Sequence, residues 1–476
     1  MPRNKTHVKT AEELVSALSS DRARLFAFLT FILCVFALGG GSRDDIQSLI
    51  ILRPLAILFC AYAVIQCNRR ILALHKMPLL LILALMILMA VQLVPLPPAI
   101  WTQLPQREIY LEIALLMEME QHWRPLSLAP TKTLNSLFSM SIPLATCLLF
   151  IIQTPESRTR IMPFIAVLGL VSGGIALLQL LGSPNGPLYF YDITNNGAAV
   201  GLFSNRNHQA IFLASVIIML AWHFSVIGAG RHPSTLSLLA ITLAVLAIIP
   251  LILVTGSRAG ILVMLVAIFP CAYFYYAAVR RKNRRSADKI SKNRKLIIMG
   301  LAVAFLSVIA LAFVLARAEA LDRLLNTRFF EGIRANLLPV LWQMAKDYFP
   351  FGSGFGSFQH IFTRYESLEL LRPNYLNQAH NDWLQFLIEG GVAAVFVAIA
   401  LLIWISAKTI DVFRNTRAYS GQRRLVIANL SILGVMALAS AGDYPLRVPI
   451  IMMVSTVSLC LLGSLERVER RSVKTG

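Results

Sequence analysis

Charged side chains are scarce in this sequence. Asp, Glu, Lys and Arg make up only 14% of its 476 residues, whereas soluble domains contain about 25%. Hydrophobic residues instead reach 57%, and the mean hydropathy is +0.67. This composition excludes an ordinary soluble protein. Apolar runs of about 18 residues or more recur along the chain, so we expect one polytopic membrane protein.

Cysteine is also scarce, and metal-binding patterns are missing. Most of the six cysteines lie inside apolar runs, and Cys67 lies at the end of one. Their placement gives no disulfide framework and no zinc-ligand spacing. The sequence also lacks the His-Glu-x-x-His zinc motif, the nucleophile elbow and the Walker loop. We therefore predict an activity that uses neither a metal nor another cofactor.

Twelve apolar stretches have lengths close to the ~20 residues that a transmembrane helix requires. They predict an all-α polytopic membrane protein of about 12 transmembrane helices, with a helical periplasmic loop domain between spans nine and ten. The predicted spans cover residues 25–41, 47–66, 77–97, 136–152, 161–182, 209–228, 235–255, 259–279, 296–316, 383–407, 425–441 and 446–464.

The predicted spans divide the chain into four parts. Two short cytoplasmic tails flank an N-terminal transmembrane bundle and a larger transmembrane core, and each membrane part contains one long outer loop. The outer loop of the core is too long for a simple connector, so we expect any chemistry to lie there. The four parts are residues 1–24, 25–182 with the loop 98–135, 183–464 with the loop 317–382, and 465–476.

The net charge of +20 is distributed unevenly between the two sides of the predicted bundle. Loops on the side of both termini hold almost all of the positive excess, and the other loops are close to neutral. The positive-inside rule therefore places both termini in the cytoplasm. The densest basic stretch, residues 280–295, is best explained as a cytoplasmic loop near anionic lipid. We expect membrane lipid, and no nucleic acid, as a partner.

Four arginines lie on the predicted outer side, three of them at span ends and Arg334 within the second outer loop. Arginine at membrane depth costs free energy unless it is paired or faces a polar cavity. A guanidinium offers five donors in a fork that matches phosphate oxygens, so a cluster would suit a diphosphate. Each arginine alone can equally be an interfacial side chain that snorkels to the headgroups. Arg258 is the strongest candidate because it follows Gly256 and Ser257 at the start of a predicted helix. The four candidates are Arg206, Arg258, Arg334 and Arg447.

His380 lies in the run AHNDWLQFLIEGG, where the second outer loop meets the tenth predicted span. A histidine side chain has an unperturbed pKa near 6.5 and can exchange protons at neutral pH. In the same run, Asp382 and Gln385 form a predicted capping box for the helix, which gives Asp382 a structural role. Glu389 is an intramembrane carboxylate that needs a partner. Arg53, inside the second span, either lines a cavity or pairs with such a carboxylate.

The turn FGSGFGSF, residues 351–358, contains three glycines. A nucleotide-binding glycine loop would need a preceding strand and a βαβ unit, and neither is predicted here. We therefore interpret the turn as a place where the backbone is free to approach another group closely.

These segments together resemble the O-antigen ligase and Wzy-type polymerase superfamily of bacterial inner-membrane proteins. The resemblance lies in GLFSNRNHQA, TGSRAG, FGSGFGSF, AHNDWLQFLIEGG and DYPLRVP, which follow in the family's order between about residues 200 and 450. It implies transfer of a glycan from an undecaprenyl-diphosphate carrier to an acceptor on the periplasmic face. The acceptor would be a lipid core for a ligase or a growing glycan for a polymerase, and the sequence leaves these two open. No metal and no nucleotide sugar would be required.

The resemblance also implies roles for particular residues. The family's functional arginine falls on Arg258 and its loop histidine on His380. A further loop arginine falls on Arg334 or Arg328. Asn205 and Asn207, on either side of Arg206, match the Asn-x-Asn motif before the sixth span. The arginines would bind the diphosphate, where fixed guanidinium groups stabilise the charge of the leaving group, and His380 would be the general base. Asp382 and Glu389 would support the site.

Two other classes of function compete with a glycan transferase. A transporter or flippase for an anionic lipid-linked solute would account for the arginines, but transporters often contain internal repeats and interrupted helices, and we find no repeat. A structural or regulatory membrane protein would leave the ordered arginines and His380 without a role. The polar residues collect at the outer edge of the predicted bundle, which favours the enzyme.

Overall fold

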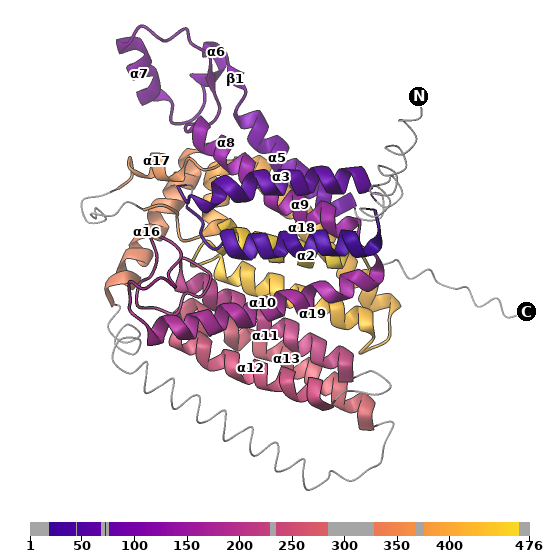
Figure 1. The fold of residues 1–476 in the computed structure, drawn as a ribbon. Helices are drawn as coiled ribbons and strands as arrows, with labels where there is room; N and C mark the ends of the chain where they lie inside the picture. Colours follow the sequence, from indigo (N-terminus) through magenta and orange to yellow (C-terminus); the bar gives the residue numbers. More distant parts are fainter. Residues whose placement is uncertain are drawn as a thin grey trace, which may run out of the picture.

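The computed structural model describes residues 19–43, 45–67, 72, 76–228, 235–283, 328–366 and 376–465. Within these ranges the fold is almost entirely helical (Figure 1). The only paired strands there are β1 (Pro95–Leu96) and β2 (Arg124–Pro125), which form a short antiparallel pair. The structure therefore confirms the predicted all-α membrane class.

The main helices follow the apolar runs of the sequence, because a helix satisfies its own backbone hydrogen bonds in lipid. Among the described residues, eight helical segments are long and apolar enough to cross a membrane, and two shorter helices are strongly apolar. The predicted spans that fall on described residues all coincide with helices. The span predicted at 296–316 lies outside the described residues. The helices are α2 (Asp21–Leu38), α3 (Ser48–Gln66), α5 (Lys76–Gln92), α8 (Pro130–Ser139), α9 (Ser141–Ile151), α10 (Pro155–Leu181), α11 (Arg206–Gly228), α12 (Thr235–Val254), α13 (Arg258–Asn283), α18 (Asp382–Asn415), α19 (Gly421–Ala439) and α20 (Pro449–Gly463).

These helices run roughly along a common direction and form one bundle (Figure 1). Helix α11 lies in its interior and packs against α10, α12, α13 and α19. Accordingly, 72% of the most apolar part of α11 is buried, against 17% for α12. A helix that is apolar on all sides is expected in such a buried position. Helix α11 therefore holds its first residues, which include His208, at a fixed place in the molecule.

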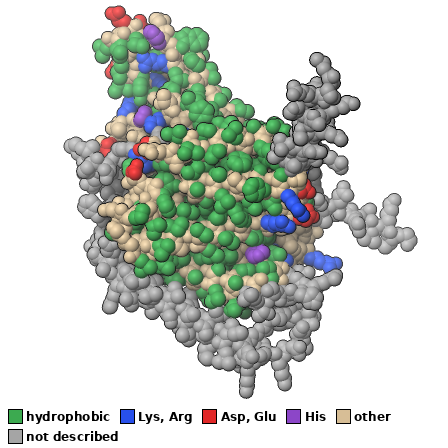
Figure 2. All heavy atoms as spheres, in the orientation of Figure 1, with side chains coloured by type: hydrophobic (Ala, Val, Ile, Leu, Met, Phe, Trp, Pro, Cys, Tyr) green, Lys and Arg blue, Asp and Glu red, His purple; other side chains and the backbone are tan. Residues whose placement is uncertain are grey.

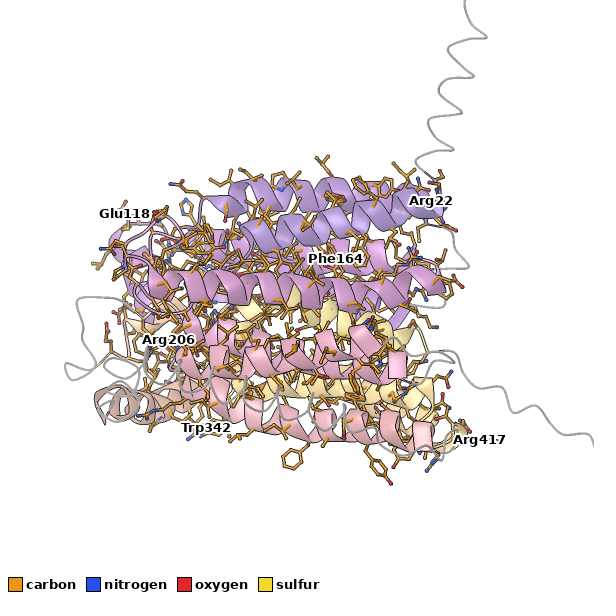
Figure 3. All side chains as sticks on the ribbon, turned by 60° about the horizontal axis from the view of Figure 1, so that its bottom comes forward. Arg22, Glu118, Phe164, Arg206, Trp342 and Arg417 are labelled. Carbon is orange, nitrogen blue, oxygen red and sulfur yellow. The ribbon has the colours of Figure 1, made fainter. Side chains whose placement is uncertain are left out.

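Successive loops lie at alternate ends of the bundle, so each end carries its own set of segments. Arg22 and Arg417 lie at one end, and Glu118, Arg206 and Trp342 lie at the other (Figure 3). We call the second end the loop end. Between the two ends the visible face is covered mainly by hydrophobic side chains (Figure 2), as expected for a surface that meets acyl chains. Which of the two ends faces the cytoplasm stays a prediction from the charge of the loops.

Two segments stand at the loop end. An arm between α5 and α8 projects from the bundle and carries α6 (Pro98–Trp101) and α7 (Glu108–Leu116) (Figure 1). The second segment contains α16 (Arg328–Asp347) and α17 (Phe358–Phe362), which share a small apolar core with the start of α18. These helices agree with the predicted helical loop domain, of which residues 317–327 and 367–375 are not described. Most of the basic stretch 280–295 and most of both predicted tails also lie outside the described residues.

Candidate active site

A buried carboxylate, Asp443, is the centre of the candidate site. It belongs to the connection from α19 to α20, which we call the 440–448 loop. Its side chain is 0% exposed and accepts hydrogen bonds from Asn207 Nδ2, at 2.7 Å, and from the backbone N–H of Tyr444, at 2.9 Å. Two imidazoles are also close, with His380 Nδ1 at 3.4 Å and His208 Nε2 at 3.7 Å from Asp443 Oδ1. The loop therefore joins the starts of α11 and α18.

The charge of Asp443 is set by these neighbours. Burial alone favours the protonated acid, but the nearby imidazoles of His208 and His380 outweigh burial and hold the pKa of Asp443 well below its usual range. A carboxylate that stays ionised at neutral pH favours a proton on a neighbouring imidazole. Asp443 is therefore a fixed negative charge beside the two imidazoles.

His380 is held in one orientation and is open on one side. Its backbone has a φ of +50°, which non-glycine residues adopt rarely. Its ring lies edge-on to the ring of Tyr444, with centroids 4.8 Å apart, and its side chain is 28% exposed. The surrounding fold thus keeps Nδ1 towards Asp443 while part of the ring remains accessible to a reactant.

The capping prediction for α18 was off by one residue. The cap is Asn381, whose side chain accepts a hydrogen bond from the backbone N–H of Leu384 at 3.0 Å. Asp382 is the first helical residue, and its carboxylate instead accepts from Ser440 Oγ and from the backbone N–H of Leu446, both at 3.1 Å. Two adjacent Asx residues offer the same capping chemistry, and here the 440–448 loop supplies other partners for Asp382.

Arg447 is held between two carboxylates of α18. Its Nε donates to Asp382 Oδ1 at 3.2 Å, and its Nη2 donates to Glu389 Oε2 at 3.1 Å. Glu389 is 0% exposed and also accepts from Gln385 Nε2 and from the backbone N–H of Phe358. The structure thus supplies the partner that Glu389 was predicted to need. Because two carboxylates offset one guanidinium, Arg447 is better suited to hold the loop against α18 than to bind a diphosphate.

Arg53 takes the first of its two predicted roles. Its Nη1 donates to Asn135 Oδ1 at 2.6 Å, and its Nη2 donates to Ser139 Oγ at 2.9 Å. Both partners lie on α8, and Arg53 lines a cleft beside Arg447. The carboxylate of Glu389 is bonded by Arg447 instead.

The glycine-rich turn packs against a break in α18. Gly391 has a φ of +59°, so the helix is interrupted directly after Glu389 and Gly390. The freed carbonyl of Glu389 accepts from Gly354 N–H at 2.9 Å and from Gln92 Nε2 at 3.0 Å. A Cβ atom on Gly352 would lie only 2.6 Å from that same carbonyl oxygen. The predicted close approach therefore occurs between two backbone segments, and it fixes the position of Glu389 relative to the glycine-rich turn.

The Asn-x-Asn motif places Arg206 beside the candidate site. Arg206 is the first residue of α11, at the loop end (Figure 3), and its backbone N–H donates to Asn195 Oδ1 at 3.1 Å. Asn205 Oδ1 accepts from the backbone N–H of Asn207 at 2.9 Å. Asn207 then contacts Asp443 through its side chain. Both motif asparagines therefore fix the backbone at the start of α11, and Arg206 lies between them in the sequence.

The other predicted arginines lie on two further helices, α13 and α16. Arg258 is the exposed first residue of α13, and Ser257 caps that helix by accepting from Gly260 N–H at 2.9 Å. Arg328 and Arg334 belong to α16, but their side chains fall outside the described residues, so the choice between them stays open. The structure thus brings His380, Asn207, Asp382 and Glu389 together at the 440–448 loop, which itself contains Arg447.

Sequence reasoning missed the residue at the centre of this site. Asp443 stands in DYPLRVP, of which only Arg447 was singled out, and His208 was not among the candidate residues. An acidic residue directly before an apolar span was the available signal, since such a residue needs a partner. Nothing local connects residues 207, 380 and 443, which lie on three different elements.

Residues 243–399 match the family model described as O-antigen ligase. The resemblance to the O-antigen ligase superfamily is confirmed. The match runs from α12 to the first half of α18 and contains Arg258, Arg334, His380 and Glu389. It supports a membrane protein of the glycan-transferring ligase or polymerase type. A search of curated proteins found no match.

Within the described ranges, no group of three or more His, Cys, Asp or Glu side chains is arranged to hold a metal ion. Independence from metal remains a prediction, which a chelator tests directly: glycan transfer is expected to persist in EDTA, and a loss that divalent ions restore would contradict it.

Proposed function

We propose that this protein transfers a glycan from an undecaprenyl-diphosphate carrier to an acceptor hydroxyl on the periplasmic face of a bacterial inner membrane, with both termini in the cytoplasm. The observation that carries the proposal is the contact between His380 and the buried Asp443, 3.4 Å apart at the loop end. His380 lies inside the segment that matches O-antigen ligases, and Asp443 gives it the partner that a general base needs.

His380 would remove the proton from the acceptor hydroxyl. Because Nδ1 faces the carboxylate of Asp443, the neutral ring keeps its proton on Nδ1 and leaves Nε2 as the acceptor of a proton. The hydroxyl oxygen then forms a bond to the anomeric carbon, and the bond from that carbon to the diphosphate oxygen breaks. Undecaprenyl diphosphate leaves with the bonding electrons. Proton transfer of this kind typically contributes about 10²- to 10⁴-fold to a rate.

The diphosphate would be bound by arginines at the helix starts. Arg206 stands next to Asn207 at the start of α11, and Arg258 stands at the start of α13, where backbone amides add to the attraction for an anion. Arg334 is the third proposed ligand. Arg447 is assigned a positioning role instead, because its bonds to Asp382 and Glu389 fix the 440–448 loop and thereby place Asp443 beside His380.

Replacing His380 tests this proposal. The variant His380→Ala should fail to restore surface polysaccharide in a deletion strain, although it reaches the membrane in normal amount. His360→Ala is the matched control, because His360 is an exposed histidine of the same outer segment and should restore the polysaccharide fully. Restoration by His380→Ala would contradict the assigned role. In the same strain, polysaccharide that is made but not attached indicates a ligase, and short chains that are still attached indicate a polymerase.

A further inference from the structure

The arm between α5 and α8 is a folded part of the structure with a small apolar core of its own. Trp101 is fully buried in that core, and its Nε1 donates to the carbonyl of His122 at 3.1 Å. At the base of the arm, Ser127 N–H donates at 2.9 Å to the carbonyl of Gln92, the last residue of α5. The arm is therefore held in a defined direction relative to the bundle.

Helix α7 turns one side towards that core and exposes the rest of its surface. Ala114 is buried in the core. Ile109, Ile113 and Leu116 follow one another at spacings of four and three, which places them on one helical stripe, and all three are exposed, Leu116 by 86%. Glu108 is also exposed, but it lies about 140° around the helix axis from Ile113. The outside of α7 is therefore amphipathic.

The apolar surface of the bundle continues onto the arm. Along α5, one of the two shorter apolar helices, Leu80, Ile87 and Val91 are more than half exposed, and so is Val94, where the arm begins. In Figure 1 the bundle helices run from side to side, and the arm extends above them at the loop end. Figure 2 shows hydrophobic side chains over the same stretch of surface. A segment that extends sideways at the end of an apolar bundle lies where the membrane surface meets water.

The charge of the arm argues against an electrostatic contact with lipid. Residues 93–129 contain four glutamates and two arginines. Arg107 is buried, and the guanidinium of Arg124 lies over the ring of Trp101, 5.1 Å from its centre. Neither arginine is therefore placed to bind an anionic headgroup, and any contact with lipid depends on the apolar side chains.

We propose that α7 lies in the surface of the membrane leaflet at the loop end, with Ile109, Ile113 and Leu116 at the boundary between headgroups and acyl chains. An amphipathic helix of this kind lies in the plane of the membrane surface, with its apolar face buried about 5–10 Å deep. The partner is the lipid surface itself, which α7 contacts through uncharged side chains. This contact depends neither on the transfer reaction nor on which side of the membrane the loop end occupies.

The test introduces the photoreactive residue p-benzoylphenylalanine into the full-length protein in phosphatidylcholine nanodiscs, and lipid adducts are counted by mass spectrometry after illumination. Ile113→p-benzoylphenylalanine should give about tenfold more lipid adduct than the matched control Glu108→p-benzoylphenylalanine, because the apolar face of such a helix lies among acyl chains and its polar face in water. Leu116→p-benzoylphenylalanine should behave like the variant at 113, and it keeps the test valid if that variant fails to fold. Equal yields at 108 and 113, or no lipid adduct at 113 and 116, would overturn the proposal.

Two further measurements exclude other partners for this face of α7. Crosslinks from position 113 to a second copy of the chain, in place of lipid adducts, would assign the face to a dimer and refute the proposal. The adduct yield should be unchanged in high salt, because salt screens charges and not apolar contacts, and a loss of adducts there would contradict an uncharged contact. His380→Ala should leave the yield at 113 unchanged, so loss of transfer and loss of this contact can be told apart.

Discussion

Asp443 and Arg447 stand four residues apart in the same loop, and their surroundings have opposite chemical character. Asp443 is one carboxylate next to two imidazoles and an amide, and imidazole is the side chain that most often transfers protons in catalysis. Arg447 is one guanidinium between two carboxylates, so its hydrogen bonds are fixed. We therefore assign proton transfer to the half of the loop with Asp443, and positioning of that half to the half with Arg447. Substitutions in the two halves should therefore fail in different ways.

The largest effect is expected in the fixed half. Glu389→Ala should destabilise the protein by about 3 kcal/mol, because it leaves Arg447 with one carboxylate and removes the acceptor of Gln385 and of the Phe358 N–H. Thermal unfolding in detergent measures this loss. Glu389→Gln keeps the size and a hydrogen-bond acceptor, so it should be less damaging. An unchanged unfolding temperature for Glu389→Ala would show that the pair with Arg447 does not hold the loop.

A smaller effect, of a different kind, is expected in the half that moves protons. Asp443→Asn keeps the shape of the side chain but removes the charge that orients His380. Transfer should fall about 100-fold, which corresponds to about 2.7 kcal/mol, while the unfolding temperature changes much less than in Glu389→Ala. The rate is measured with purified protein and a lipid-linked donor. If Asp443→Asn lost stability and activity in proportion, the distinction between the two halves would be wrong.

The smallest effect is expected at the helix cap beside His380. Asn381→Ala should cost about 1 kcal/mol, a typical value for the loss of an N-cap side chain. Because Asn381 also donates to the carbonyl of Ala441 at 3.1 Å, the variant should loosen the 440–448 loop slightly and lower transfer only a few-fold. Asn381→Asp is the matched comparison, because a carboxylate caps a helix as well as an amide does. A loss of stability in Asn381→Asp equal to that in Asn381→Ala would contradict the capping role.

The helices could be predicted because the information for them is local. A run of apolar residues excludes water wherever it lies, so the predicted spans coincide with helices throughout the described part of the chain. The ends are less accurate where a side chain has a distant partner. The third span was predicted to reach residue 97, but α5 ends at Gln92, whose side chain bonds Phe355 N–H and the carbonyl of Glu389.

The site could be predicted only in part, for the same reason. The segments around His380, Arg206 and Arg447 were recognised as belonging together, since each carries an unusual polar residue at a span end. Their pairing depends on how α11, α18 and the 440–448 loop pack, and no local pattern contains that information. As a result Arg447 was predicted to bind substrate, although Asp382 and Glu389 hold it, and Asp443 was not singled out.

The most direct test of the account is a double-variant cycle on His380 and Asp443. Single-turnover transfer is measured for His380→Gln, Asp443→Asn and the double variant, each with donor already bound. If the carboxylate acts through the imidazole, the double variant transfers no more slowly than His380→Gln alone. Two independent losses that multiply in the double variant would contradict the claim that these residues work as one unit.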